Sequence, residues 1–223
     1  MTHVTTAEAA LRLGVSQRQV QRLIEARELP ARRTAGDAWV VDALAINAMA
    51  RSRPARGRPW SPATAWAALW RVSGLEVDWL DRRTMKRLDD RLTSIDAKEL
   101  VHTTRRRALV RRYRASESFL ADLEALVIRT GACAMEPSTF RLERDHGRVD
   151  GYCTSEVAAR LAHDLHLVED PLGKATLRVG AVPSVALGGH DAMPVAVIAA
   201  DLAESLDVRE RSAGLRVLER LLR

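Results

Sequence analysis

Side chains that can donate several hydrogen bonds at once gather between residues 16 and 33 of this chain. Arginine presents a planar fork of donors that matches guanine, and glutamine pairs in the same bidentate way with adenine. We therefore expect contacts with duplex DNA from Ser16, Gln17, Arg18, Gln21, Arg22, Arg32 and Arg33. The alternative is that the arginines among them form only a solvated helix face, as most surface charges do.

Other reactive residue types lack the partners that catalysis requires. His163 and His166 flank Asp164 with no third ligand at a recognisable spacing, and the Gly188–Asp191 segment offers a lone His-Asp pair. Neither Cys133 nor Cys153 lies in a nucleophile motif or has a paired cysteine nearby, so both are expected to be ordinary reduced thiols. We expect no enzymatic activity, no metal site and no cofactor.

Two short helices joined by a tight turn are predicted to position the donor side chains. Thr5 and Glu8 have the spacing of a capping box, so a helix begins there and ends near Gly14. Ser16 caps a second helix, about residues 17–26, whose polar face carries the arginines and glutamines. Its opposite face is apolar and comprises Val20, Leu23 and Ile24.

The segment after the second helix has the pattern of a β-hairpin. Residues 29–33 and 38–41 are predicted strands around a glycine-containing turn at 34–37, which together would form a wing. Asp42 is expected to cap a further helix that continues to Met49. Two helices followed by a hairpin match an arrangement in which the second helix enters the major groove.

Residues 4–50 resemble the excisionase and MerR-like helix-turn-helix family. The shared features are Thr5-x-x-Glu8-Ala-Ala, Leu13-Gly-Val-Ser16, Leu29-Pro-Ala31 and the aromatic Trp39. Where that family often has basic residues near the wing tip and after the aromatic, this chain has Asp37 and Val40. The resemblance implies DNA binding carried by the second helix more than by the wing tip.

Charge divides the chain into a basic front and an acidic back. Residues 1–120 hold 23 Lys and Arg against 13 Asp and Glu, a net charge of +10, whereas residues 121–223 hold 12 against 16, a net of −4. A basic segment attracts polyanions such as DNA, because each neutralised phosphate releases counterions. The acidic back is expected to face a protein partner instead.

A basic linker is predicted at residues 51–59. This stretch contains two prolines, a glycine and no large apolar side chain, together with Arg51, Arg53, Arg56 and Arg58. Those four arginines could lie along the DNA backbone, as arms beside helix-turn-helix modules do. A solvated linker that touches nothing is the alternative.

The middle region, residues 60–150, is expected to be mainly helical. Helices are predicted from Ser61 to Ser73, over 82–92, from Asp96 to about Arg107, and after Ser116, with a β-like run at 108–114. Four tryptophans fall within about twenty residues here, and packing is favoured over base stacking because they share apolar faces. Arg105, Arg106 and Arg107 could touch DNA or an acidic partner, or form a solvated face.

The C-terminal region, residues 151–223, is predicted to contain a helix, a hairpin and further helices. Thr154 opens the first helix, the hairpin joins residues 167–170 to 175–179, and an apolar helix follows between Met193 and Leu206. Asp207 caps the final helix. A helix followed by a hairpin is consistent with a second, degenerate winged helix or with a small partner-binding fold.

This C-terminal half resembles antitoxins of the AbiEi type, whose toxins are nucleotidyltransferases. The resemblance rests on residues 167–170, 176–179, 195–202 and 207–210. It implies binding to the operon's own promoter, repression of that promoter and opposition to a neighbouring toxin. The family's usual N-terminal winged helix is of another kind than the excisionase-like unit of this chain.

We therefore expect an α+β chain, mostly α, with a winged helix-turn-helix at 1–50 followed by a helix-rich region with short β-hairpins. The predicted function is a sequence-specific transcriptional regulator that binds double-stranded DNA at its own promoter, at inverted repeats, as antitoxin and autorepressor. A cognate toxin is the expected protein partner, and oligomers are compatible with this function. No apolar run approaches the ~20 residues of a membrane span, so a cytoplasmic protein is expected. The alternative is a non-catalytic interaction adaptor with a vestigial helix-turn-helix.

Overall fold

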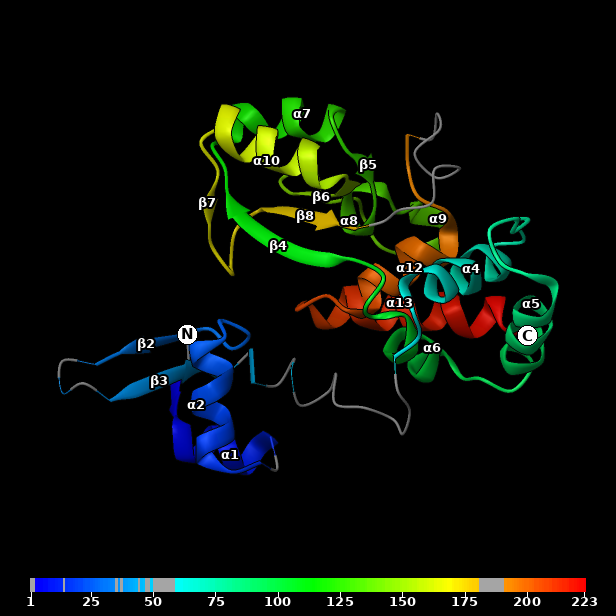
Figure 1. Ribbon diagram of the computed structural model, residues 1–223. Coiled ribbons are helices and arrows are strands. Elements are labelled where there is room, and N and C mark those ends of the chain that lie inside the picture. The colour runs from blue at the N-terminus through cyan, green and yellow to red at the C-terminus, as the bar shows by residue number, and fades with distance from the viewer. Residues whose placement is uncertain are drawn as a thin grey trace. The chain divides into compact units, whose positions relative to one another are not determined.

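The computed structural model describes residues 3–13, 15–34, 36, 38–43, 45–46, 49, 59–180 and 191–223. The chain divides into two compact units, Met1–Pro54 and Ala55–Arg223, here called the N-terminal and C-terminal units (Figure 1). Both units mix helices and strands. Residues 150 and 151, where the sequence predicts a boundary between two regions, both belong to one strand of the C-terminal unit.

The N-terminal unit packs two helices against a small antiparallel sheet. Its elements in chain order are β1 (His3–Thr5), α1 (Thr6–Leu13), α2 (Gln17–Glu25), β2 (Ala31–Arg33) and β3 (Trp39–Asp42). The strand order is β1-β3-β2. The sequence patterns predicted β2 and β3 but missed β1, a three-residue strand whose Val4 is buried and pairs with Val41.

Helices α1 and α2 both begin at the predicted caps. The Thr5 hydroxyl accepts from the Glu8 backbone N–H at 3.2 Å, and the Ser16 hydroxyl accepts from that of Gln19, also at 3.2 Å. A core of buried apolar residues then joins helices to sheet; it includes Ala9, Leu13, Val20, Ile24, Leu29, Val41 and Ile46. Residues 43, 45, 46 and 49 are helical, in line with the helix expected after Asp42.

The C-terminal unit contains a five-stranded sheet with helices on both faces. Its strands are β4 (Leu109–Arg114), β5 (Ile128–Arg129), β6 (Val149–Cys153), β7 (Val168–Glu169) and β8 (Ala175–Val179), in the order β5-β6-β8-β4-β7. Its helices are α4 (Pro62–Val72), α5 (Arg82–Leu92), α6 (Ala97–Thr104), α7 (Glu117–Ala125), α8 (Gly131–Ala134), α9 (Pro137–Phe140), α10 (Ser155–Asp164), α12 (Val195–Ala203) and α13 (Val208–Leu221).

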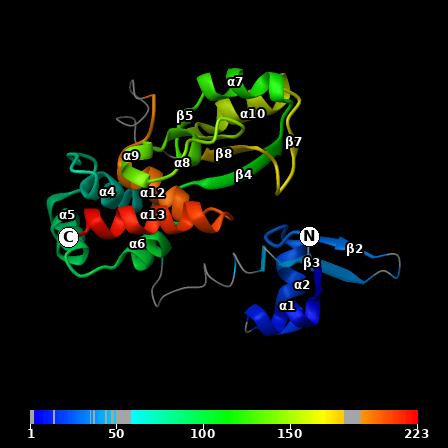
Figure 2. The same ribbon diagram turned by 180° about the vertical axis from the view of Figure 1, so that it is seen from behind.

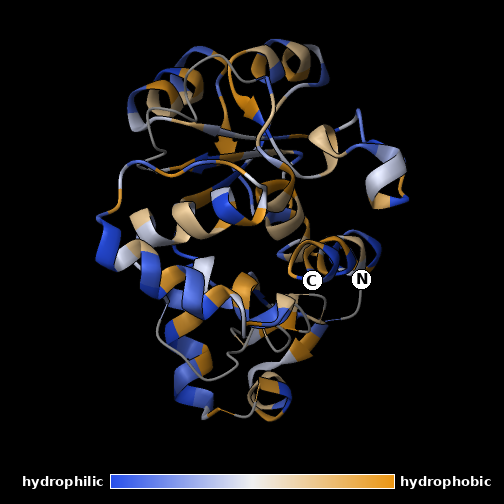
Figure 3. Ribbon diagram, turned by 90° about the vertical axis from the view of Figure 1, so that its right-hand side faces the viewer, coloured by the Kyte–Doolittle hydropathy of each residue, from blue (hydrophilic) through white to orange (hydrophobic). Residues whose placement is uncertain are grey.

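Different helices cover the two faces of this sheet. In both views α7 and α10 lie on one side of it, and α12 and α13 lie on the other (Figures 1 and 2). Leu123 of α7 and Leu161 of α10 pack with Tyr113, Cys153 and Leu177 of the strands. Individual helices contain both hydrophilic and hydrophobic residues, as expected of helices with one buried face (Figure 3).

Helix α12 forms the centre of the second core. Every residue from Ala196 to Ala203 is buried, including the charged Asp201. This confirms the core helix predicted between Met193 and Leu206. The Ser73 hydroxyl, at the end of α4, accepts from the Ala196 backbone N–H at 3.0 Å and so caps the start of α12.

The tryptophan-rich segment belongs to the same core, as predicted. Trp66 is fully buried and Trp70 is 2% exposed. Their rings meet edge to face, with centroids 5.7 Å apart, and Trp66 makes a similar contact with Tyr152 at 5.0 Å. These rings therefore stabilise the fold through packing.

The prediction of a hairpin between residues 167 and 179 is wrong. Strands β7 and β8 do not pair with each other, because β4 lies between them and pairs antiparallel with both. Glu169 and Ala175 both lie opposite Tyr113, so the chain crosses over β4 at that residue. Gly173 allows the crossing, since a Cβ atom there would collide with the Tyr113 carbonyl group.

None of the helices in the described ranges is both long and apolar enough to cross a bilayer.

Candidate nucleic-acid interface

The exposed face of α2 is held in place by burial of its opposite face. Val20 is fully buried and Ile24 is 7% exposed, both packed against α1 and the sheet. The helix ends at Glu25 with Ala26 as its C-cap, and Arg27 then adopts a left-handed conformation with φ of 56°. The backbone N–H of Glu28 closes this end by donating to the Leu23 carbonyl at 2.9 Å.

Three predicted contact residues lie on the exposed side of this helix. Arg18, Gln21 and Arg22 are all exposed. Within the part of the chain that the structure describes, their side chains form no hydrogen bond or ion pair. Arg18 and Arg22 are one helical turn apart and Gln21 lies between them, so the three side chains share one face. This face is suited to bidentate hydrogen bonds with base edges in a major groove.

Two other predicted contact residues also have local structural roles. The Gln17 amide donates from Nε2 to the Thr6 hydroxyl at 2.8 Å, which ties the start of α2 to the start of α1. The Ser16 hydroxyl accepts from the Gln19 backbone as the helix cap. Both side chains remain exposed and are therefore still accessible to a ligand.

The hairpin of β2 and β3 presents the remaining two predicted contacts. Arg32 pairs with Val40 in the register and is exposed. Arg33 pairs with Trp39, and its guanidinium lies over the Trp39 ring, 4.9 Å from the centroid. This cation–π contact fixes the direction of Arg33. Asp37, at the predicted wing tip, lies outside the described residues, as do Arg51, Arg53, Arg56 and Arg58.

Among the residues considered for catalysis, those that the structure describes are not assembled into a reactive group. His163, Asp164 and His166 are exposed at the end of α10, and His190 lies outside the described residues. In the described ranges no three His, Cys, Asp or Glu residues are placed to hold a metal ion. Cys133 and Cys153 are buried free thiols, and burial raises the pKa of each to about 11. They are therefore protonated and poor nucleophiles at neutral pH.

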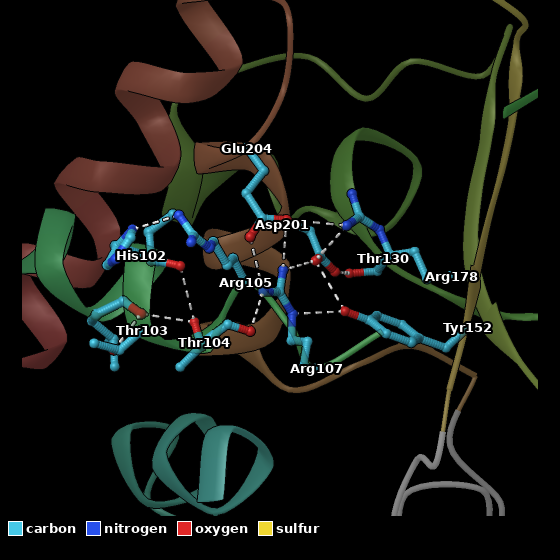
Figure 4. A network of polar contacts seen from close by, with 12 residues as sticks. His102, Thr103, Thr104, Arg105, Arg107, Thr130, Tyr152, Arg178, Asp201 and Glu204 are labelled. Atoms are coloured by element: carbon cyan, nitrogen blue, oxygen red, sulfur yellow. Dashed lines mark hydrogen bonds and ion pairs between the residues drawn. The ribbon is translucent and has the colours of Figure 1, made fainter. Parts of the chain in front are cut away.

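A buried polar network was missed by the sequence patterns (Figure 4). Arg107 follows α6 and is 2% exposed, which corrects the expectation that it belongs to a solvated or ligand-binding run. Its guanidinium donates to Asp201 of α12, to Glu204 at 3.0 Å and to the Tyr152 hydroxyl at 2.9 Å. Arg105 and Arg106, its neighbours, are exposed.

A second arginine completes this network from β8. Arg178 forms a bidentate pair with Asp150 at 2.7 and 2.9 Å and also lies 2.9 Å from Asp201. The other Asp201 oxygen accepts from the Thr130 hydroxyl at 2.5 Å. Burial alone would lower the pKa of Arg107, but the surrounding carboxylates outweigh it and raise the pKa. The network thus joins β6 and β8 to α12 through paired charges.

No local pattern could have identified this network. Its arginines and carboxylates are separated by up to 97 residues along the chain. The only signal was Asp201, a single acid inside an apolar helix, because a buried carboxylate requires a partner.

Comparison with known proteins identifies one domain of this chain. Residues 4–54 match the family model of a helix-turn-helix domain. No curated protein and no solved structure matches the chain. The matched segment coincides with the N-terminal unit, so the chain carries an N-terminal helix-turn-helix domain, a domain typical of DNA-binding regulators.

Proposed function

We propose that this protein is a sequence-specific DNA-binding transcriptional regulator whose α2 reads base edges in the major groove. The observation that carries the proposal is the uncommitted face of Arg18, Gln21 and Arg22 on a helix whose other face is buried. The hairpin of β2 and β3 acts as the wing of a winged helix, with Arg32 directed to phosphate oxygens. Ser16 and Gln17 add contacts with the DNA from the start of this helix.

The regulator is further proposed to be the antitoxin and autorepressor of an operon that encodes a nucleotidyltransferase-type toxin. Resemblance of residues 167–170, 176–179, 195–202 and 207–210 to AbiEi-type antitoxins supports this. These segments belong to β7, β8, α12 and the start of α13, and the network of Arg178 and Asp201 links two of them. In this proposal the acidic C-terminal region meets the toxin and performs no catalysis.

DNA binding is tested by fluorescence anisotropy with the duplex upstream of the protein's own gene and with an unrelated duplex. We expect Arg18→Ala and Arg22→Ala each to weaken binding to the upstream duplex by about 1 to 3 kcal/mol, the usual value of one bidentate pairing with a base. Arg160→Ala, at an exposed position of α10, is the matched control and should bind like wild type. Equal affinity of wild type for both duplexes would reject sequence-specific regulation and favour the adaptor alternative.

The antitoxin role needs a separate measurement. Co-expression with the adjacent gene should relieve growth arrest caused by that gene, and a footprint should cover inverted repeats in the shared promoter. If the adjacent gene product is harmless, or if its toxicity persists at full expression of this chain, the antitoxin proposal fails while DNA binding stands.

A further inference from the structure

Helix α5 of the C-terminal unit carries a compact group of exposed cations. Leu88 is buried and Met85 and Leu92 pack against the same core, so this side of the helix is fixed. The opposite side presents four exposed basic residues, here called the α5 basic face: Arg82, Arg83, Lys86 and Arg87. The helix lies at the outer edge of its unit in both views (Figures 1 and 2).

The position of these cations is unfavourable for the helix itself. Unpaired N–H groups make a helix N-terminus positive, so acidic residues stabilise the first turn and basic residues destabilise it. The first turn of α5 contains Arg82 and Arg83 and no acid. Like charges also face each other one turn apart, in the pairs Arg82–Lys86 and Arg83–Arg87. Helix stability therefore does not account for this group.

In the described ranges no neighbouring carboxylate forms an ion pair with the α5 basic face. The capping Asp81 accepts from the Thr84 hydroxyl at 2.6 Å and from its backbone N–H at 2.9 Å, and these bonds lower its pKa, with a smaller contribution from the charge of Arg87. Asp89 pairs with Arg71 at 3.1 Å, and Glu99 pairs with Arg91. Within the described ranges Arg82, Arg83 and Lys86 have no ion-pair partner, and Arg87 donates only to the Thr84 hydroxyl at 3.2 Å.

We propose that the α5 basic face binds the phosphate backbone of DNA as a second binding surface besides α2. Protein interfaces are enriched in aromatic and apolar residues and depleted of lysine, whereas no large apolar side chain of α5 is exposed. Closely spaced arginine and lysine side chains are the usual ligands of phosphates. This surface adds affinity without sequence preference, and it rests on the proposed function in that the ligand is the same DNA.

The test measures how binding of the full-length protein to the upstream and to the unrelated duplex depends on salt. The variant replaces all four residues of the face: Arg82→Gln, Arg83→Gln, Lys86→Gln and Arg87→Gln. A matched control removes four exposed arginines elsewhere in the same unit, with the same change in net charge: Arg160→Gln, Arg209→Gln, Arg216→Gln and Arg223→Gln.

We expect the slope of log affinity against log salt to be smaller in magnitude for the face variant, by about 0.9 for each phosphate that it no longer neutralises, on both duplexes. The preference for the upstream duplex should persist, and the control variant should keep the wild-type slope. The face variant should also melt at a temperature equal to or above that of wild type, because cations leave the helix N-terminus.

An unchanged slope in the face variant, an equal decrease in the control, or a wild-type protein that binds no duplex would overturn the proposal. Failure of base reading gives a different result: Arg18→Ala and Arg22→Ala would leave the preference between duplexes unchanged while the salt slopes still respond to the α5 basic face. The two proposals can therefore fail independently.

Discussion

Arg107 and Asp201 form an ion pair shielded from solvent although 94 residues separate them along the chain. Their side chains are 2% and 0% exposed. Tyr152 strengthens the pair because its hydroxyl accepts from Arg107 at 2.9 Å and donates to Asp201 at 3.0 Å. The contact fastens the end of α6 and the sheet to α12, and so connects segments that are distant in sequence.

The first prediction concerns removal of one member of this pair. Asp201→Asn should lower the free energy of unfolding by about 3 to 5 kcal/mol, because it leaves Arg107 and Arg178 buried with insufficient opposite charge. Urea denaturation followed by circular dichroism measures the change. Asp89→Asn, at a half-exposed surface pair, is the control and should stay within about 0.5 kcal/mol of wild type. Equal effects of the two substitutions would show that the buried pair is not a main support of the fold.

Local chemistry made much of the secondary structure predictable. Ser16, Ser61, Thr154 and Asp207 were expected helix caps, and each side chain accepts a backbone hydrogen bond at the start of its helix. The signals lie within three residues of the helix start, so a single sequence contains them. The exposed face of α2 followed from the same local periodicity.

Pairing between distant strands could not be predicted in this way. Nothing in residues 167–179 indicates that β4, more than fifty residues earlier, inserts between β7 and β8. A short turn containing Pro171 and Gly173 suggested a hairpin, which is the commonest local solution. Arg107 likewise looked like one member of a surface run, because its carboxylate partners are on a helix almost a hundred residues later.

The second prediction tests the crossing of the chain over β4. Gly173→Ala should destabilise the protein by about 1 to 3 kcal/mol or more, because the new methyl group would meet the Tyr113 backbone, which cannot rotate away. Thermal melting of the C-terminal unit measures this effect. Gly147→Ala is the control, since its added methyl group would meet only the Asp145 side chain, at 3.3 Å. A Gly173→Ala protein as stable as the control would contradict the close approach.

The third prediction concerns stability at alkaline pH. Burial raises the pKa of the Cys133 and Cys153 thiols from 9.0 to about 11. In the unfolded chain the thiols release their protons at lower pH than in the folded chain. Their contribution to the free energy of unfolding is therefore fully present below pH 9 and is lost as the pH rises toward 11. Each thiol contributes a slope of about 1.4 kcal/mol per pH unit within that window.

Urea titrations at pH 8, 9, 10 and 11 measure this slope. The double variant Cys133→Ala, Cys153→Ala should be destabilised less than wild type between pH 9 and 11, and the difference between the two curves isolates the thiols. Parallel curves would mean that neither thiol titrates differently in the folded and unfolded states.

The fourth prediction separates two glutamines on adjacent turns of α2. Gln17→Ala should lower the stability of the N-terminal unit by about 1 kcal/mol, because it removes the 2.8 Å hydrogen bond to Thr6, a side chain that is 9% exposed. Gln21→Ala should leave stability unchanged and weaken binding to the upstream duplex by about 1 to 3 kcal/mol, since Gln21 is exposed and uncommitted.

Melting curves and anisotropy titrations on both variants give the two quantities side by side. The contrast depends on the Gln17 amide holding α1 and α2 together while the Gln21 amide is free to pair with a base. A Gln17→Ala protein with normal stability would show that the bond to Thr6 does not hold α1 and α2 together, and a Gln21→Ala protein with unchanged duplex binding would show that Gln21 does not pair with a base.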